Sequence, residues 1–283
     1  MFLQLILNGL VNGCIYGLFA MGLVILLKSS TLLNFAHGEF FMLSAFFAFT
    51  LLRFHFPYLI SIVAPIFVLF FIGTFLNRVI FERMMNAPHI SLVVITIGLS
   101  SLFKGAARLI WGTDIRTMPS LFSEKPIKAF GMVFTYQDTL IVISTVTFGI
   151  VFVMIFFWTR IGKIMRAATQ SFRGAALVGI NVGTFLKVMW GLSAAIGAFA
   201  GMLIAPLTLI YPDMGERILM RAFAGLILGG YGNIKGAIIG SIVIALIENL
   251  VNGYISSSLG DLSPFILMIG ILLIRPSGLY GER

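Results

Sequence analysis

Residues 5–27 read LILNGLVNGCIYGLFAMGLVILL, an apolar run without a charged side chain that is closed by Lys28. A helix of about 20 mostly apolar residues spans the hydrocarbon core of a bilayer. The residues before this run, Met1 to Gln4, lack the basic cluster of a secretory signal peptide. We therefore expect the run to remain in the protein as a membrane helix.

The rest of the chain has the same character. Its 283 residues are 59% hydrophobic and only 10% charged, whereas a soluble domain carries about 25% charged residues. Eight or nine membrane helices would use roughly 160 to 180 residues and leave about 100 for connections, too few for a second domain of ordinary size. We expect one all-α, polytopic transmembrane bundle over residues 1–283, with eight or nine crossings.

Eight further apolar runs follow the first one. They are separated by short segments that contain charged residues, Pro or Gly, and we expect a helix in each. The runs cover residues 40–52, 58–76, 90–111, 139–158, 188–211, 218–230, 237–255 and 264–274.

The basic residues predict the orientation, because cytoplasmic loops of membrane proteins are enriched in Lys and Arg. The 159–187 loop has basic residues and no Asp or Glu, whereas charges balance in the 112–138 loop. We expect the 159–187 loop in the cytoplasm, and the 112–138 loop and the N-terminus outside. If the last three runs, 218–230, 237–255 and 264–274, all cross, the chain has nine crossings. If the 218–230 run is re-entrant instead, it has eight. The net charge of +9 is then explained by cytoplasmic loops and anionic lipid, not by nucleic acid.

Two of the runs, 40–52 and 218–230, are too short to span. Each has about 13 residues and covers roughly 20 Å of a roughly 30 Å core. One lies in each half of the chain, beside a glycine-containing polar stretch, and such broken helices point to the central pathway of a transporter. The alternative is short tilted helices with plain loops, in which Asn34 caps the next helix. The candidate pathway residues are Asn34, Phe35, His37, Gly38, Glu39, Gly229, Gly230 and Asn233.

Glu248 is a further candidate pathway residue, because it lies in the middle of the 237–255 run. A carboxylate at membrane depth is either functional or paired with a basic group on a neighbouring helix, and the sequence leaves both open.

Lys104 and Arg108 lie four residues apart near the outer end of their helix, and we expect them to extend to the membrane interface. Residues 10–15 and 250–255 match at five of six positions, either by chance or as a relic of two related halves.

Several kinds of site have no support in the sequence. His37 and Glu39 lack a third metal ligand at a recognisable spacing, and Cys14 is the single cysteine. The glycines from 225 to 240 are not followed by the Gly-Lys-Ser/Thr of a phosphate-binding loop. No nucleophile and base occur at a recognisable spacing. We therefore expect that the chain is not an enzyme and holds no metal or cofactor. Any ATP must be bound by another subunit.

Within 159–187, apolar and small residues recur at helical spacing from Ile164 to Gly179. Such a basic amphipathic helix lies on a membrane surface or docks into the groove of a partner. The residues alone leave both open.

Four motifs in order carry a resemblance over nearly the whole chain. They are NFAHGE at 34–39, the segment 162–181, GGYGN at 229–233 and RPSGLYG at 275–281. With them the chain resembles the permease subunits of branched-chain amino acid ABC importers, of the H-subunit type in the leucine/isoleucine/valine system. The resemblance implies a bacterial or archaeal inner-membrane protein that translocates hydrophobic amino acids by alternating access. Its implied partners are two ATP-binding subunits, a second related permease and a periplasmic or surface substrate-binding protein.

The resemblance also implies that 159–187 contains the segment that couples the permease to an ATP-binding subunit. Members of the family usually carry acidic residues there, whereas this chain has only basic ones. Alternatives are the same type of importer for urea or short amides, a passive channel, and an intramembrane enzyme. The candidate coupling residues are Gly162, Met165, Arg166, Ala167, Ala176, Gly179, Ile180 and Asn181.

Overall fold

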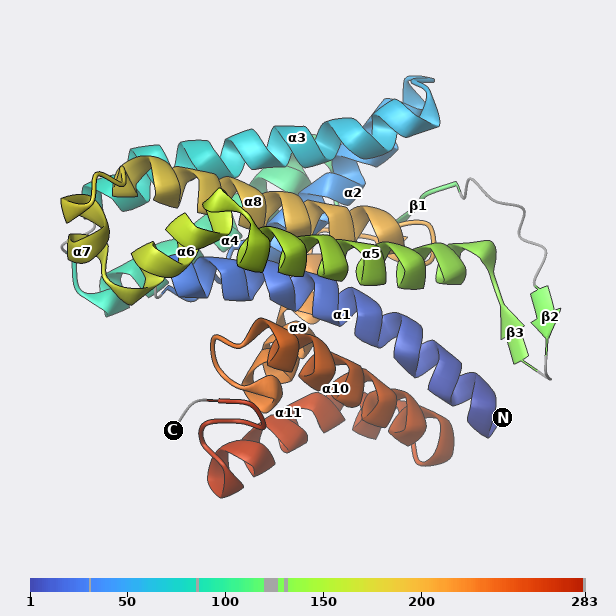
Figure 1. Ribbon diagram of the computed structural model, residues 1–283. Coiled ribbons are helices and arrows are strands. Elements are labelled where there is room, and N and C mark those ends of the chain that lie inside the picture. Colours follow the sequence, from blue (N-terminus) through green and yellow to red (C-terminus); the bar gives the residue numbers. More distant parts are fainter. Residues whose placement is uncertain (31, 85–86, 120–126, 130–131, 282–283) are drawn as a thin grey trace.

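The computed structural model describes residues 1–30, 32–84, 87–119, 127–129 and 132–281. Seven helices are long and apolar enough to cross a membrane, and they run side by side along one axis (Figure 1). This confirms the predicted all-α polytopic bundle. The seven are α1 (Phe2–Ser30), α3 (Tyr58–Leu76), α4 (His89–Trp111), α5 (Tyr136–Trp158), α8 (Val182–Ile204), α10 (Ile234–Tyr254) and α11 (Ser257–Ile274).

The bundle has two distinct ends. At the hairpin end, strands β2 (Ile127–Ala129) and β3 (Met132–Phe134) pair antiparallel, and the Gln4 side chain forms two hydrogen bonds with the Val133 backbone. At the α7 end lie α6 (Arg160–Gln170) and α7 (Phe172–Leu177). Part of the predicted external loop, 120–126 and 130–131, lies outside the described residues. The loops 112–138 and 159–187 thus belong to opposite ends.

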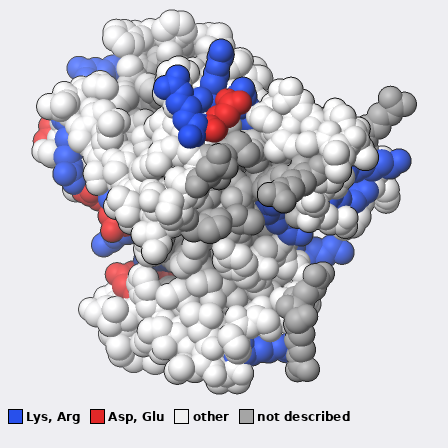
Figure 2. Space-filling view, turned by 90° about the vertical axis from the view of Figure 1, so that its left-hand side faces the viewer, with Lys and Arg blue, Asp and Glu red and all other residues white. Residues whose placement is uncertain are grey.

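The α7 end is rich in basic residues. Figure 2 looks onto this end and shows more Lys and Arg than Asp and Glu on the visible face. The C-terminal segment also lies at this end, whereas the N-terminus lies at the hairpin end (Figure 1). The two termini therefore lie at opposite ends of the bundle.

Two short helices begin in the middle of the bundle. His37, the first residue of α2 (His37–Arg53), packs against Gly22 of α1 and Gly197 of α8. From there α2 runs to the hairpin end, where Trp111 stacks on Phe46. The other short helix, α9 (Met214–Gly229), runs to the α7 end. A non-helical segment precedes each of them, residues 32–36 before α2 and 205–213 before α9. Each segment and its short helix together complete one traverse of the bundle.

The segment before α9 corrects a sequence-based expectation. The apolar run 188–211 was expected to be one helix, but α8 ends at Ile204 and the chain forms β4 (Leu209–Ile210). This strand pairs antiparallel with β1 (Arg116–Thr117) from the loop after α4. At its other end α8 begins earlier than expected, because the Asn181 side chain accepts a hydrogen bond from the Thr184 N–H.

The last helix also begins earlier than its apolar run. Ser256 caps α11 by accepting a hydrogen bond from the Leu259 N–H, so Pro264 lies inside the helix and not at its start. Proline has no N–H to donate to the carbonyl four residues earlier. That carbonyl, on Gly260, instead accepts a hydrogen bond from the Ser263 hydroxyl at 2.8 Å.

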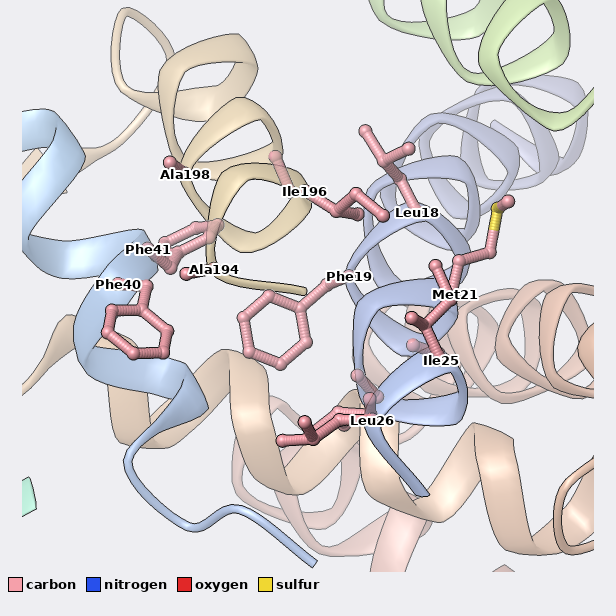
Figure 3. Packing of buried hydrophobic residues seen from close by; sticks show 14 of the residues in the cluster. Leu18, Phe19, Met21, Ile25, Leu26, Phe40, Phe41, Ala194, Ile196 and Ala198 are labelled. Atoms are coloured by element: carbon pink, nitrogen blue, oxygen red, sulfur yellow. The ribbon is translucent and has the colours of Figure 1, made fainter. Parts of the chain in front are cut away.

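The core is built around α1. Of the most apolar stretch of each helix, 89% is buried in α1 but only 17% in α4 and α11, which places α1 inside and the other two at the periphery. Figure 3 shows Phe19 of α1 pointing toward α2 and α8, where Phe40, Phe41 and Ala194 lie. Aromatic and small side chains therefore fill the space around the start of α2.

Helices α1 and α10 are antiparallel and approach closely at glycines. A Cβ added to Gly13 would lie 2.7 Å from the Cα of Ile242, and one on Gly9 would lie 2.9 Å from the Cα of Leu246. Gly253, in the second copy of the 10–15 echo, packs on Leu5 in the same interface. Small residues allow such close helix packing in membranes.

We predict that Gly13→Ala destabilises the protein, because its new methyl group would collide with the α10 backbone. The expected loss is about 1–3 kcal/mol, the usual cost of overpacking. Gly149→Ala is the matched control, since nothing lies within 4 Å of a Cβ there and Ala is the better helix former. Thermal unfolding in detergent should show a lower midpoint for Gly13→Ala and an unchanged or higher one for Gly149→Ala. Equal midpoints would contradict the packing described.

Candidate functional site

The two short helices touch at their first turns. A Cβ on Gly38 of α2 would collide with the carbonyl of Gly215 in α9, and one on Gly215 would collide with the carbonyl of Gly38. Only glycine at both positions allows this approach. The N-termini of both helices therefore meet in the middle of the bundle, where their unpaired N–H groups and dipoles create positive potential.

The same dipeptide, Gly-Glu, follows the first residue of both helices. His37-Gly38-Glu39 opens α2 and Met214-Gly215-Glu216 opens α9. Each glutamate lies in the first turn of its helix, where a negative charge stabilises the helix. Lys104 of α4 lies between them, with its Nζ 2.6 Å from Glu216 Oε2 and 3.9 Å from Glu39 Oε1. Sequence analysis missed this repeat.

Glu39 and His37 are both buried at this crossing. Glu39 Oε1 accepts a hydrogen bond from the Ser100 hydroxyl at 2.8 Å. The His37 ring lies edge-on to Phe19, with ring centroids 4.5 Å apart. Ser193 Oγ lies 3.2 Å from His37 Nδ1 and donates a hydrogen bond to the Gly22 carbonyl. His37 therefore ties α2 to α1 and α8 at the level where α2 begins.

The residues just before α2 shape its start. Asn34 Oδ1 accepts a hydrogen bond from the Ala36 N–H at 3.0 Å, and the Asn34 carbonyl accepts one from the His37 N–H. Asn34 thus forms a turn before the helix but does not cap it as the sequence alternative had it, because the N-cap residue is Ala36 and the N-terminus has no side-chain cap. Phe35 packs against the hydrophobic core.

Lys104 and Arg108, expected to extend to the membrane interface, both form ion pairs with residues at the start of α9. Arg108 Nη2 binds both carboxylate oxygens of Asp213 at 2.8 and 3.0 Å, and Lys104 binds Glu216 as described above. These ion pairs were not visible in the α4 sequence. The two pairs tie α4 to the start of α9.

Glu248 belongs to a separate network. Its Oε1 lies 2.7 Å from Arg221 Nε, and its Oε2 accepts a hydrogen bond from the Tyr16 hydroxyl at 3.2 Å. Arg221 also binds Asp261 of α11 at 2.7 Å. Glu248 therefore has a basic partner on a neighbouring helix, as one of the two alternatives predicted. Arg221 links α9 to α10 and α11, and no local pattern would have revealed this.

Gly229, Gly230 and Asn233 lie at the α7 end, away from His37 and Glu39. The N–H groups of Leu279 and Tyr280 donate hydrogen bonds to the carbonyls of Leu228 and Gly229. Asn233 caps α10 through the Gly236 N–H and donates to the Tyr280 carbonyl. Gly230 has a φ of +115°, which favours glycine. The geometry here is that of a turn holding the C-terminal segment.

The candidate coupling residues divide into a held group and an exposed group. A Cβ on Gly162 would collide with α5 carbonyls, Met165 is buried, and Arg166 donates to the Phe156 carbonyl. At the far tip, Leu177 and Val178 are 88% and 74% exposed. The remaining candidates are Ala167, partly buried in α6, exposed Ala176 and Gly179, partly buried Ile180, and Asn181, the cap of α8.

Two cavities flank residues 205–213. One of about 540 Å³ lies between α1, α9 and α10 and is lined by residues that include Tyr16, Arg221 and Glu248. The other, of about 670 Å³, lies on the α4 side and is lined by residues that include Arg108 and Asp213. Both are in the size range of small-molecule sites. The non-helical segment before α9 therefore has open space on both sides.

A multi-pass bundle with two half-length helices meeting at its centre and cavities beside them defines the class of membrane transport proteins. The comparisons with known proteins agree. The family model described as "Branched-chain amino acid transport system / permease component" matches residues 5–272. The chain belongs to this family, whose members are membrane components of transport systems and not enzymes.

The permease protein LivH of the high-affinity branched-chain amino acid transport system of Escherichia coli (strain K12) is 29% identical over 99% of this chain and 96% of its own length. BraD of the corresponding system of Pseudomonas aeruginosa is 28% identical over the same shares. A probable LivH of the archaeon Methanocaldococcus jannaschii is 26% identical over 93% of this chain and 88% of its own. No solved structure matches the chain.

We predict that Arg221→Gln lowers the free energy of unfolding by about 3–5 kcal/mol, because it leaves Glu248 buried without its charged partner. Arg108→Gln is the matched control, since it breaks an exposed pair worth about 0.2–1 kcal/mol. Denaturant unfolding in detergent measures both. Adding Glu248→Gln to Arg221→Gln should recover part of the loss, and a further, fully additive loss would contradict the pairing.

Proposed function

We propose that this chain is one of the two permease subunits of an ATP-driven importer that carries branched-chain amino acids by alternating access. The observation that carries the proposal is the contact of α2 and α9 at Gly38 and Gly215. Half-length helices from both halves of a chain, meeting at their N-termini, are the arrangement that transporters use to form a central substrate pathway. The names of the relatives support the substrate class.

The α7 end suits the coupling role. The segment 159–187 forms two short helices separated by Ser171, and its apolar tip at Leu177 and Val178 is exposed. On this proposal the tip docks into a cleft of an ATP-binding subunit, and Gly162, Met165 and Arg166 hold the segment against α5. Closure of the ATP-binding subunits would then move α6 and α7 as a unit and shift α5 and α8 relative to α1.

The orientation follows the charge asymmetry. On this proposal the basic α7 end faces the cytoplasm and the hairpin end faces the outside of the bacterial or archaeal inner membrane. A substrate-binding protein would deliver the amino acid at the hairpin end. The partners are therefore two ATP-binding subunits, a second related permease chain, this binding protein and the surrounding lipid.

The test is reconstitution of the complex in liposomes. The chain is co-expressed with its genomic neighbours and purified in mild detergent. ATP-dependent uptake is then assayed with the binding protein added outside the liposomes. Uptake of leucine, isoleucine or valine supports the proposal. Preferential uptake of urea would replace branched-chain amino acids as the substrate class. Uptake without ATP or without partner subunits would favour a channel.

We predict that Gly38→Leu abolishes uptake, because the added side chain cannot fit against the Gly215 carbonyl and the two helices must separate. Gly105→Leu is the matched control, since a Cβ there has nothing within 4 Å. Both variants are compared at equal amounts of assembled complex. Uptake by Gly38→Leu at the parent rate would show that the contact is not needed for transport.

We predict that Leu177→Asp reduces co-purification of the ATP-binding subunits about tenfold or more, because a charge replaces an exposed apolar contact at the α7 tip. Val133→Asp, at the opposite end of the bundle and 43% exposed, should leave the complex intact. The measurement is the ratio of the subunits after affinity purification through this chain. Equal ratios for both variants would exclude the tip as the docking surface.

A further inference from the structure

The charged side chains around the start of α9 are almost all paired. Asp213 pairs with Arg108, Glu216 with Lys104, and Arg221 with Glu248 and Asp261. The exception is Arg217. In the part of the chain that the structure describes, its guanidinium has neither an ion pair nor a hydrogen bond. Because the Arg217 side chain is also exposed, its guanidinium is free to bind a partner from outside the chain.

Arg217 is placed to meet such a partner. It lies on the first turn of α9, two residues after the Gly215 contact, and its side chain is exposed. It lines both the 540 Å³ and the 670 Å³ cavity. A solute beside residues 205–213 could therefore reach the guanidinium from either side.

The larger part of the 540 Å³ cavity wall suits an aliphatic side chain. Alongside the charged residues it has apolar residues and a few hydrogen-bonding groups. The apolar ones include Phe41, Ile204, Leu207, Met214 and Ile218, and the polar ones include Asn12, Thr208 and Tyr211. An apolar wall with few polar groups is the usual composition of a small-molecule site.

We propose that Arg217 binds the carboxylate of the transported amino acid as it passes residues 205–213. A guanidinium binds a carboxylate through two parallel hydrogen bonds, a geometry that a lysine ammonium does not reproduce. The aliphatic side chain of the substrate then lies against the apolar wall. This inference rests on the proposed function and adds the residue that recognises the substrate.

Arg221 does not serve this purpose, although it lines the same cavity. Its guanidinium is occupied by Glu248 and Asp261, and its removal is expected to destabilise the bundle. Arg217 has no such structural task, so its substitution should affect transport and leave folding unchanged. This difference makes the proposal testable by mutation.

The experiment uses the full complex in liposomes with Cys14, the single cysteine of the chain, replaced by Ala. In this background Arg217→Cys should lower leucine uptake about tenfold to a hundredfold, the equivalent of a lost charge-assisted hydrogen bond. Modification with the positively charged aminoethyl methanethiosulfonate should restore part of the uptake. The negatively charged sulfonatoethyl reagent should not. Leucine should slow the reaction at position 217.

Arg78→Cys is the matched control, because Arg78 is also exposed but lines neither cavity. It should keep parental uptake, and leucine should not protect it. Arg217→Lys should retain more uptake than Arg217→Cys, and both should assemble like the parent. If the parent background itself takes up no leucine, the proposed function fails whatever Arg217 does.

Two results would overturn the carboxylate site while the importer stands. One is parental uptake by Arg217→Cys with no protection by leucine. The other is a thiol at position 217 that does not react in the assembled complex even without leucine, but reacts in the isolated chain. That result would mean that Arg217 meets the second permease and not the substrate.

Discussion

The contact between Gly38 and Gly215 is the constraint on which the rest of the structure depends. Two backbones meet there without side chains between them, and both belong to helix N-termini. Two positive helix ends at one point repel each other unless negative charge is close. Glu39 and Glu216 supply that charge from the first turn of each helix, and Lys104 lies close enough to balance both.

The ion pairs around α9 extend this arrangement to the rest of the bundle. Arg108 and Lys104 connect α9 to α4, and Arg221 connects it to α10 and α11. The Arg108–Asp213 pair borders one of the two cavities, and the Arg221–Glu248 pair borders the other. A helix held by charges at its first two turns, beside open space, can be displaced by a change at either side. On the proposed function, this is a physical basis for coupling movement of the α7 end to the centre of the bundle.

The sequence predicted the long helices well, because apolar run length reports directly on membrane crossing. It also identified α2 and α9 as short. It did not predict that residues 205–211 leave the helix, since the apolar run continues through them to Tyr211. Partners far apart along the chain, such as Tyr16 with Glu248 or Lys104 with Glu216, leave no local signal. The Gly-Glu pair near the start of both short helices is present in the sequence, but it is only two residues long. The longer match, at 10–15 and 250–255, pointed to a different helix pair, α1 and α10. Whether the candidate pathway and coupling residues have those roles stays a prediction.

The hydrogen bonds from Leu279 and Tyr280 to the end of α9 have a consequence for the order in which the protein is built. The carbonyls of Leu228 and Gly229 find these partners only after α10 and α11 have been synthesised and the chain has turned back. Until then these two carbonyls lack the partners that hold the end of α9 at the α7 end of the bundle. During biogenesis α9 is therefore completed late, although α1, against which it packs, is the first helix made.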